Sequence, residues 1–127
     1  MTKTQIKSIA TQASRQLSAV AKDVCNRDLV TAINHTSLKE ISNQLDDLYG
    51  VLDTAYERNL KVCLSNAMEY TDLIKKRIDA LAEYIRPNRL KTSHTSPKLI
   101  VQMLDTEQQS IHHLLTLLDE INIGGKV

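Results

Sequence analysis

The stretch SLKEISNQLDDLYGVLDTAYERNLKVCLSNAMEYTDLIKKRIDALAEYIR, residues 37–86, decides the fold of this chain. It contains no proline and one glycine, Gly50. At about 100° per residue its large apolar side chains fall on a stripe roughly 120° wide, which is the pattern of an amphipathic helix. Leu73 and Tyr84 widen this stripe on one side. The stripe itself consists of Leu38, Ile41, Leu45, Leu48, Leu52, Tyr56, Leu60, Cys63, Ala67, Tyr70, Ile74, Ile78, Leu81 and Ile85.

The length of this stretch sets two alternatives for the fold. A continuous helix of about 50 residues would span about 75 Å, whereas a compact chain of this size has a diameter of roughly 36 Å. We favour the continuous helix, because the stripe keeps its phase through Leu60 and Tyr70 and because Ser65-Asn66 is a poor helix breaker. The prediction is an all-α antiparallel bundle around one long central helix, residues 37–86. The alternative is a compact four-helix bundle with a break near residues 64–66.

Two further helices flank the central one. Apolar spacing predicts an N-terminal helix over residues 4–25, and a C-terminal helix over residues 97–122 begins at Ser96-Pro97, with serine as N-cap and proline at the first helical position. Residues 28–33 read as a short separate helix. Ser37 and Glu40 have the spacing of a capping box, which places the start of the central helix at Ser37.

Composition agrees with a single helical domain, residues 1–127. The 127 residues include no Phe, no Trp, four Tyr, three Gly and two Pro, so the core must be aliphatic and the turns few. The sequence contains no sustained alternation of apolar and polar residues and no Asn-Gly or Asp-Gly turn, so nothing in it predicts a β-hairpin.

The sequence also bears on where the protein works. The first residues lack the apolar segment of a secretory signal, and no stretch is apolar enough to span a membrane. Cys25 and Cys63 each lie on an apolar helical face, where we expect two buried, reduced thiols. We therefore expect a cytoplasmic protein.

Charge is balanced overall and uneven along the chain. The net charge is +1, which gives no general argument for nucleic acid. The first helix and the second half of the central stretch are basic, whereas the first half of that stretch and the last helix are acidic. Opposite charges predict that the first helix lies beside the acidic half and the last helix beside the basic half.

A stripe this long and wide is more than its own chain can cover if the central helix is continuous. A partner subunit would then cover the remainder, and antiparallel self-association is the simplest solution. The expected function is that of a non-enzymatic protein-protein interaction module: an adaptor, regulator or chaperone-like bundle with coiled-coil packing, which forms a homodimer and binds another protein.

Polar residues interrupt the apolar faces at four positions: Asn59, Asn66, Arg77 and Glu107. A buried carboxylate needs a partner, and Arg77 is the expected partner of Glu107. We interpret the four as register or binding residues, as polar core positions are in coiled coils. A small-ligand or metal sensor in the bundle core is the second alternative function. The neighbouring His112 and His113 point about 100° apart and do not form a metal-ligand pair, so we expect no metal and no cofactor.

The connection after the central stretch is basic and contains two helix-breaking prolines. Between Glu83 and Asp105 there is no acidic residue. Together with the preceding turns, this region offers a candidate patch for an anion or nucleic acid, which is the first alternative function. The patch consists of Lys75, Lys76, Arg86, Arg89, Lys91 and Lys98.

Within this loop, Arg89-Leu-Lys-Thr-Ser-His94 resembles the Arg-x4-His motif of the HEPN ribonuclease superfamily, whose members are small helical bundles. The resemblance covers six residues, and it departs from the family pattern at Leu90, where a polar residue is usual. It implies that Arg89 would stabilise phosphate charge and that His94 would act in acid–base catalysis. Otherwise no catalytic constellation is present in the sequence, and we lean towards a protein that is not an enzyme.

Overall fold

The computed structural model describes residues 3–59, 62–86 and 96–120, without the side chains of 56–59 and 62–63. These ranges contain four helices and no strand: α1 (Lys3–Arg27), α2 (Ala32–Asn59), α3 (Val62–Tyr84) and α5 (Pro97–Asp119). The predicted all-α antiparallel bundle is confirmed.

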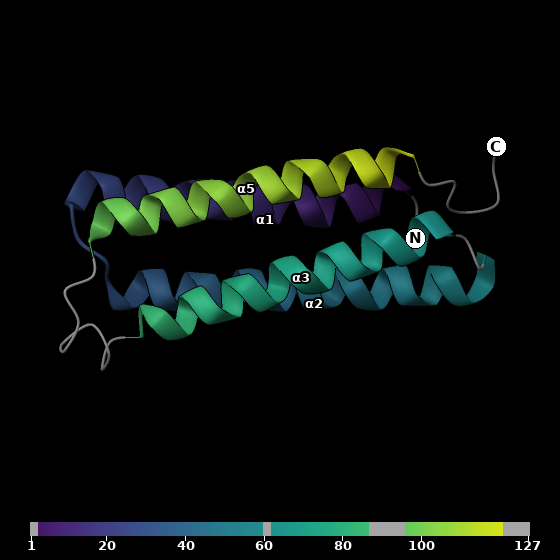
Figure 1. Cartoon of the computed structure of the whole chain (residues 1–127), viewed down its shortest axis with the longest axis horizontal. Helices are drawn as coiled ribbons and strands as arrows, with labels where there is room; N and C mark the ends of the chain where they lie inside the picture. Colours follow the sequence, from purple (N-terminus) through teal and green to yellow (C-terminus); the bar gives the residue numbers. More distant parts are fainter. Residues whose placement is uncertain (1–2, 60–61, 87–95, 121–127) are drawn as a thin grey trace.

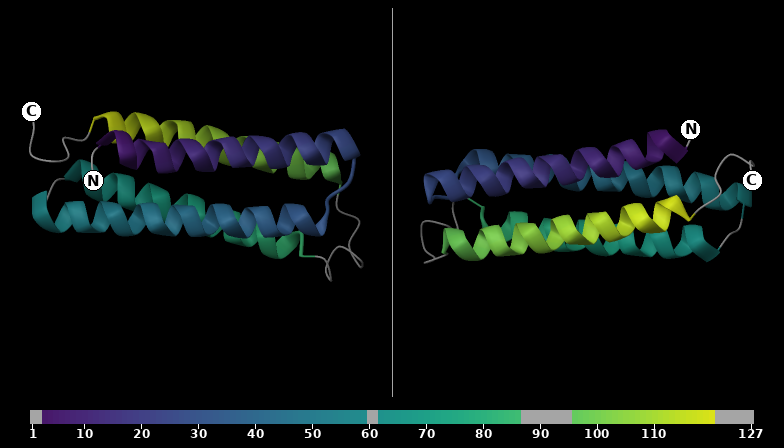
Figure 2. Two further views of the ribbon diagram at one scale, coloured as in Figure 1. Left: turned by 180° about the vertical axis from the view of Figure 1, so that it is seen from behind. Right: turned by 90° about the horizontal axis from the view of Figure 1, so that it is seen from above.

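Successive helices run in opposite directions along one bundle axis (Figures 1 and 2). Each helix packs against two others, so that α1 contacts α2 and α5, and α3 contacts the same two helices. The pairs α1/α5 and α2/α3 are the most closely packed. The charge-based prediction of neighbours is therefore confirmed, because the basic α1 lies beside the acidic α2 and the acidic α5 lies beside the basic α3.

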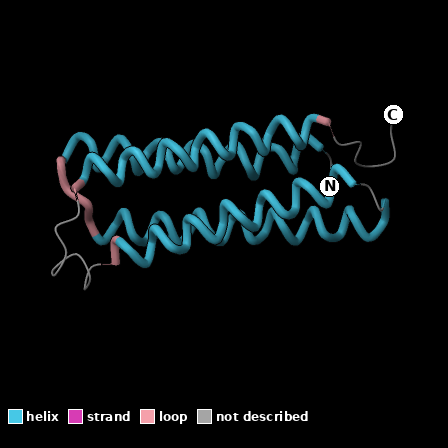
Figure 3. Tube along the Cα trace, viewed as in Figure 1, coloured by secondary structure: helices cyan, strands magenta, loops and turns pink. Residues whose placement is uncertain are grey.

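The continuous helix over residues 37–86 is wrong, and the four-helix alternative is right. Helix α2 ends at Asn59, α3 begins at Val62, and the two lie side by side (Figure 3). The reversal precedes the expected break at 64–66, and Leu64 is fully buried within α3. The apolar stripe in the sequence does not reveal the reversal, because α2 and α3 each turn an apolar face toward one shared core.

The start of α2 also differs from the prediction, because the helix begins at Ala32 and residues 28–33 form no helix of their own. The capping box is Thr31 with Asn34. The Asn34 N–H donates to Thr31 Oγ1 at 3.3 Å, and the Thr31 N–H donates to Asn34 Oδ1 at 2.8 Å. The chain turns just before this box, where Asp28 adopts a left-handed φ of 49°. Ser37 therefore lies inside α2.

The outer helices follow the predicted boundaries closely. Helix α1 extends to Arg27, two residues beyond the expected end. Helix α5 begins at Pro97 after an extended Ser96, as Ser96-Pro97 predicts, although the Ser96 side chain makes no capping hydrogen bond. The last residues of the predicted 97–122 helix lie outside the described ranges.

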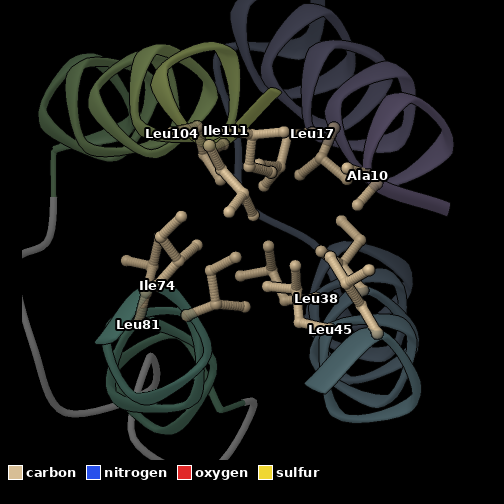
Figure 4. Packing of buried hydrophobic residues seen from close by; sticks show 14 of the residues in the cluster. Ala10, Leu17, Leu38, Leu45, Ile74, Leu81, Leu104 and Ile111 are labelled. Carbon is tan, nitrogen blue, oxygen red and sulfur yellow. The ribbon is translucent and has the colours of Figure 1, made fainter. Parts of the chain in front are cut away.

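Aliphatic side chains from all four helices fill the centre of the bundle (Figure 4). Leu38, Leu45, Ile74 and Ile111 are among those with no exposed surface. This is the Phe-free, Trp-free core that the composition predicts.

One buried position was predicted wrongly, because the Cys25 thiol is exposed. Val24 occupies the buried face of α1 at that turn, and the next residue points about 100° away from it. The side chain of Cys63 lies outside the described part. None of the helices, over the residues described, is long and apolar enough to cross a membrane.

Candidate functional site

The candidate site is the surface between α3 and α5, on the front face in Figure 1. Helices α3 and α5 contact each other less extensively than α3 contacts α2 or than α5 contacts α1. Their antiparallel course pairs Tyr70 with His113 toward one end and Arg77 with Glu107 near the middle. Polar and aromatic groups thus lie along a seam that is less closely packed than its neighbours.

The Arg77–Glu107 ion pair occupies the floor of this seam. Arg77 Nε donates to Glu107 Oε1 at 3.0 Å, and Arg77 Nη2 donates to Ser110 Oγ at 2.9 Å. The Glu107 side chain is 9% exposed, whereas that of Arg77 is 39% exposed. The pairing expected from the sequence is present, and the arginine still offers part of its guanidinium to solvent.

Burial raises the pKa of the Glu107 carboxyl, although Arg77 acts in the opposite direction through its charge and its hydrogen bond. A carboxylate in this position loses more hydration than one arginine at the surface restores. Burial of the ionised Glu107 carboxylate therefore lowers the stability of the fold, and the ion pair with Arg77 offsets part of that loss.

Apolar side chains surround the exposed part of Arg77. A groove of about 340 Å³, the α3–α5 groove, is lined by Arg77, Ala80, Leu81, Tyr84, Met103 and Glu107. Leu73 lies one turn before Arg77 on α3, and Leu99 lies one turn before Met103 on α5, so the two extend the apolar surface at opposite ends.

Large apolar side chains are exposed both in the groove and one turn beyond its lining. Leu73 is 46% exposed, Leu99 42% and Met103 38%. The other large apolar residues exposed in the described ranges, Leu29 and Ile33, lie at the α1–α2 corner, across the bundle. Three of the five such side chains thus gather on one face.

At the opposite end of the seam, the rings of Tyr70 and His113 meet edge to face, with centroids 5.0 Å apart and planes inclined at 65°. This contact holds the two helices together beyond the open part. His113 is thereby a packing partner of Tyr70, and no set of three His, Cys, Asp or Glu residues in the described ranges is grouped to hold a metal.

The remaining register residues do not join this site. Asn66 is exposed on α3, because the stripe at this turn is carried by Leu64 and Ala67. The side chain of Asn59 lies outside the described part. Only Arg77 and Glu107 of the four are brought together.

Three of the six residues of the predicted basic patch, Lys75, Lys76 and Arg86, pair with acidic residues. Lys75 pairs with Asp79 at 2.8 Å, and the Ser42 hydroxyl of α2 donates to the same carboxylate, so this lysine belongs to the α2–α3 interface. Lys76 pairs with Asp72 at 2.8 Å.

At the far end of α3, Arg86 pairs with Glu83 at 3.2 Å. Lys98 is exposed in the first turn of α5. Arg89 and His94, which carry the HEPN resemblance, and Lys91 lie outside the described residues.

Sequence reasoning missed the apolar wall of the groove. Its signal was present, since Leu73 and Tyr84 widen the stripe of residues 37–86 on one side. That widening was interpreted as surface for a second subunit on a continuous helix. On the folded-back α3 the same side chains flank α5.

No family model, curated protein or solved structure matches this chain.

Proposed function

We propose that this chain is a protein-binding module whose binding surface is the α3–α5 groove. The observation that carries the proposal is that the groove sets the exposed Met103 beside the partly exposed Arg77, with the exposed Leu73 and Leu99 one turn further along α3 and α5. Exposed apolar groups around one charged residue, beside a rigid bundle, are the usual composition of a protein interface.

The rest of the surface supports this choice by contrast. Among the described side chains of α2, Ile33 at the helix start is the one large apolar group that is exposed, and exposed positions further along carry charge, as at Glu40, Asp46 and Asp53. Arginine, tyrosine and methionine are enriched where proteins bind one another, and the groove contains one of each.

Self-association stays a prediction, but the reason first given for it no longer applies. The homodimer was expected because a continuous helix would leave its stripe uncovered, and α2 and α3 now cover each other. A cytoplasmic location also stays a prediction, which the exposed free thiol of Cys25 supports, because reduced thiols are usual in that compartment.

The test compares the groove with a matched surface. The double variant Leu73→Gln/Met103→Gln removes two exposed apolar groups from the groove, and the control Ile33→Gln removes one that is 72% exposed at the α1–α2 corner. Affinity capture from the native source should recover a partner with the wild type and the control, and lose it with the double variant. A partner retained equally by all three proteins would contradict the proposal.

A further inference from the structure

We propose that the occupant of the α3–α5 groove is an acidic amphipathic helix of another protein, which places a carboxylate on Arg77. This inference rests on the proposed function and adds the chemistry of the partner. Three features of the groove lead to it: its length, its exposed guanidinium and the charge of the chain at its end.

The apolar wall has the length of a short helix. On α3 it runs from Leu73 to Tyr84, which is twelve residues, and the eleven rises between them span about 16 Å along the helix axis. That is about three helical turns, which matches a partner helix with apolar anchors at i, i+4 and i+7. Met103 lines the facing wall, and its flexible side chain adapts to differently shaped anchors.

Arg77 gives the groove a positive centre. Its contacts with Glu107 and Ser110 use two of the five N–H groups of the guanidinium. The one acidic residue in the lining, Glu107, is already paired and faces the core. A carboxylate above the groove would therefore meet an exposed cation, and charge-assisted pairing with arginine fixes its position.

Described residues near the end of the groove add more positive charge. Tyr84 and Met103 both line the groove, and Arg86 lies two residues after Tyr84 whereas Lys98 lies five residues before Met103. Arg86 is partly neutralised by Glu83, whereas Lys98 is exposed in the first turn of α5. This charge favours acidic partners and speeds their association.

A second copy of this chain fits the groove poorly. A twofold dimer would bring two identical linings together, in which each Glu107 is already paired with its own Arg77 and no further carboxylate is offered to the exposed guanidinium groups. Among the side chains that the structure describes, none on the acidic surface of α2 around Asp46, Asp47 and Asp53 is a large exposed apolar group that could enter the groove. A partner helix that is both acidic and apolar satisfies the two requirements together.

The probe is a displayed library of helical peptides, four to five turns long, with apolar residues at i, i+4 and i+7 and all other positions random. The folded wild-type protein is the bait, and the Leu73→Gln/Met103→Gln variant is the counter-selection. Both substitutions are at exposed positions and leave the core intact. We expect peptides that require the groove and contain more Asp and Glu than Lys and Arg.

Each selected peptide is then measured by fluorescence anisotropy. Binding should weaken about tenfold or more in the double variant and stay unchanged in Ile33→Gln. Lys98→Glu should weaken it about three- to tenfold, with a smaller dependence on salt, whereas Lys22→Glu on α1 should not.

The outcomes separate this inference from the proposed function. Groove-dependent peptides that are neutral or basic would overturn the acidic partner and keep the groove as a binding surface. No groove-dependent peptide at all would overturn both. A sedimentation dimer that the double variant abolishes would identify the occupant as a second copy and overturn the acidic partner.

Discussion

Arg77 and Glu107 join α3 to α5 at the floor of the groove, with the acid nearly buried and the base half exposed. The carboxylate depends on this arginine, because burial alone would leave it without sufficient solvation. The arginine depends less on the carboxylate, since water reaches it. The pair is therefore asymmetric, and so are the expected effects of changing its members.

We expect Arg77→Met to lower the free energy of unfolding by about 1–3 kcal/mol at neutral pH. The substitution leaves Glu107 buried without its cation, and the exposure of Arg77 places the effect below that of a fully buried pair. Chemical denaturation monitored by circular dichroism measures it.

The double variant Arg77→Met/Glu107→Met tests whether the pair itself stabilises the bundle. We expect it to recover most of the stability, since two apolar side chains can replace an ion pair at this depth. A double variant that is as unstable as Arg77→Met would show that the pair is needed for the packing of α3 on α5.

The raised pKa of Glu107 predicts a specific dependence on pH. In the folded protein Glu107 keeps its proton at pH values where the unfolded chain, with an ordinary glutamate pKa of about 4.3, has lost it. The unfolded state then binds fewer protons, so the contribution of Glu107 to stability is present below that pH and declines as the pH rises through the raised pKa.

The difference in unfolding free energy between wild type and Glu107→Gln isolates this contribution. This difference should favour wild type most at low pH and shrink as the pH rises. Asp79 and Asp119, whose pKa values are lowered by Lys75 and Lys7 respectively, make stability depend on pH in the opposite direction, and they do so equally in both proteins. A difference that grows with pH would contradict the direction of the Glu107 shift.

At the scale of the helices, α2 contains one glycine, Gly50, at an exposed position within the helix. A Cβ at Gly50 would meet nothing within 4 Å. The position therefore carries the entropic cost of glycine without any packing reason for it.

We expect Gly50→Ala to raise the unfolding free energy by about 0.5–1 kcal/mol, and with it the thermal midpoint. Thermal denaturation measures the shift. The matched control is Ala19→Gly at an exposed position of α1, which should lose a similar amount. An unchanged or lower midpoint for Gly50→Ala would mean that this part of α2 is not helical in solution.

At the scale of the whole molecule, the reversal between α2 and α3 decides the dimensions of the protein. The longest helix, α2, has 28 residues, which corresponds to about 42 Å. A continuous helix over residues 37–86 would have reached about 75 Å.

Small-angle X-ray scattering distinguishes these two shapes. We expect a radius of gyration near that of a compact chain of this length, about 14 Å, with a modest excess from the elongated bundle. A maximum dimension above about 75 Å in a monomeric sample would restore the continuous helix. Sedimentation at several concentrations supplies the mass needed for that comparison.

Much of the fold was predictable from local pattern. Ser96-Pro97 placed the start of α5, the apolar spacing of α1 placed its buried face, and the polar interruption at Glu107 pointed to Arg77 as a candidate partner. Each of these depends on residues within one helix or on the rule that a buried charge needs a counter-charge.

The start of α2 was misplaced for a related reason. Ser37 with Glu40 and Thr31 with Asn34 both have the spacing of a capping box, and the spacing does not rank them. Asn34 also donates to Asp23 on α1 at 2.9 Å, and this contact exists only after α1 and α2 have packed. The sequence offered both caps, and tertiary packing favoured the earlier one.

The sequence by itself determined that the chain is helical, which faces are apolar and that a buried Glu107 requires a counter-charge, because these follow from periodicity and from the cost of a buried charge. Tertiary structure alone decided that residues 37–86 fold back between Asn59 and Val62. Two helices that face one core have the same apolar period before and after the turn between them. The period alone therefore does not reveal the turn. The same packing left Leu73, Leu99 and Met103 exposed, since their burial depends on how closely α5 approaches α3.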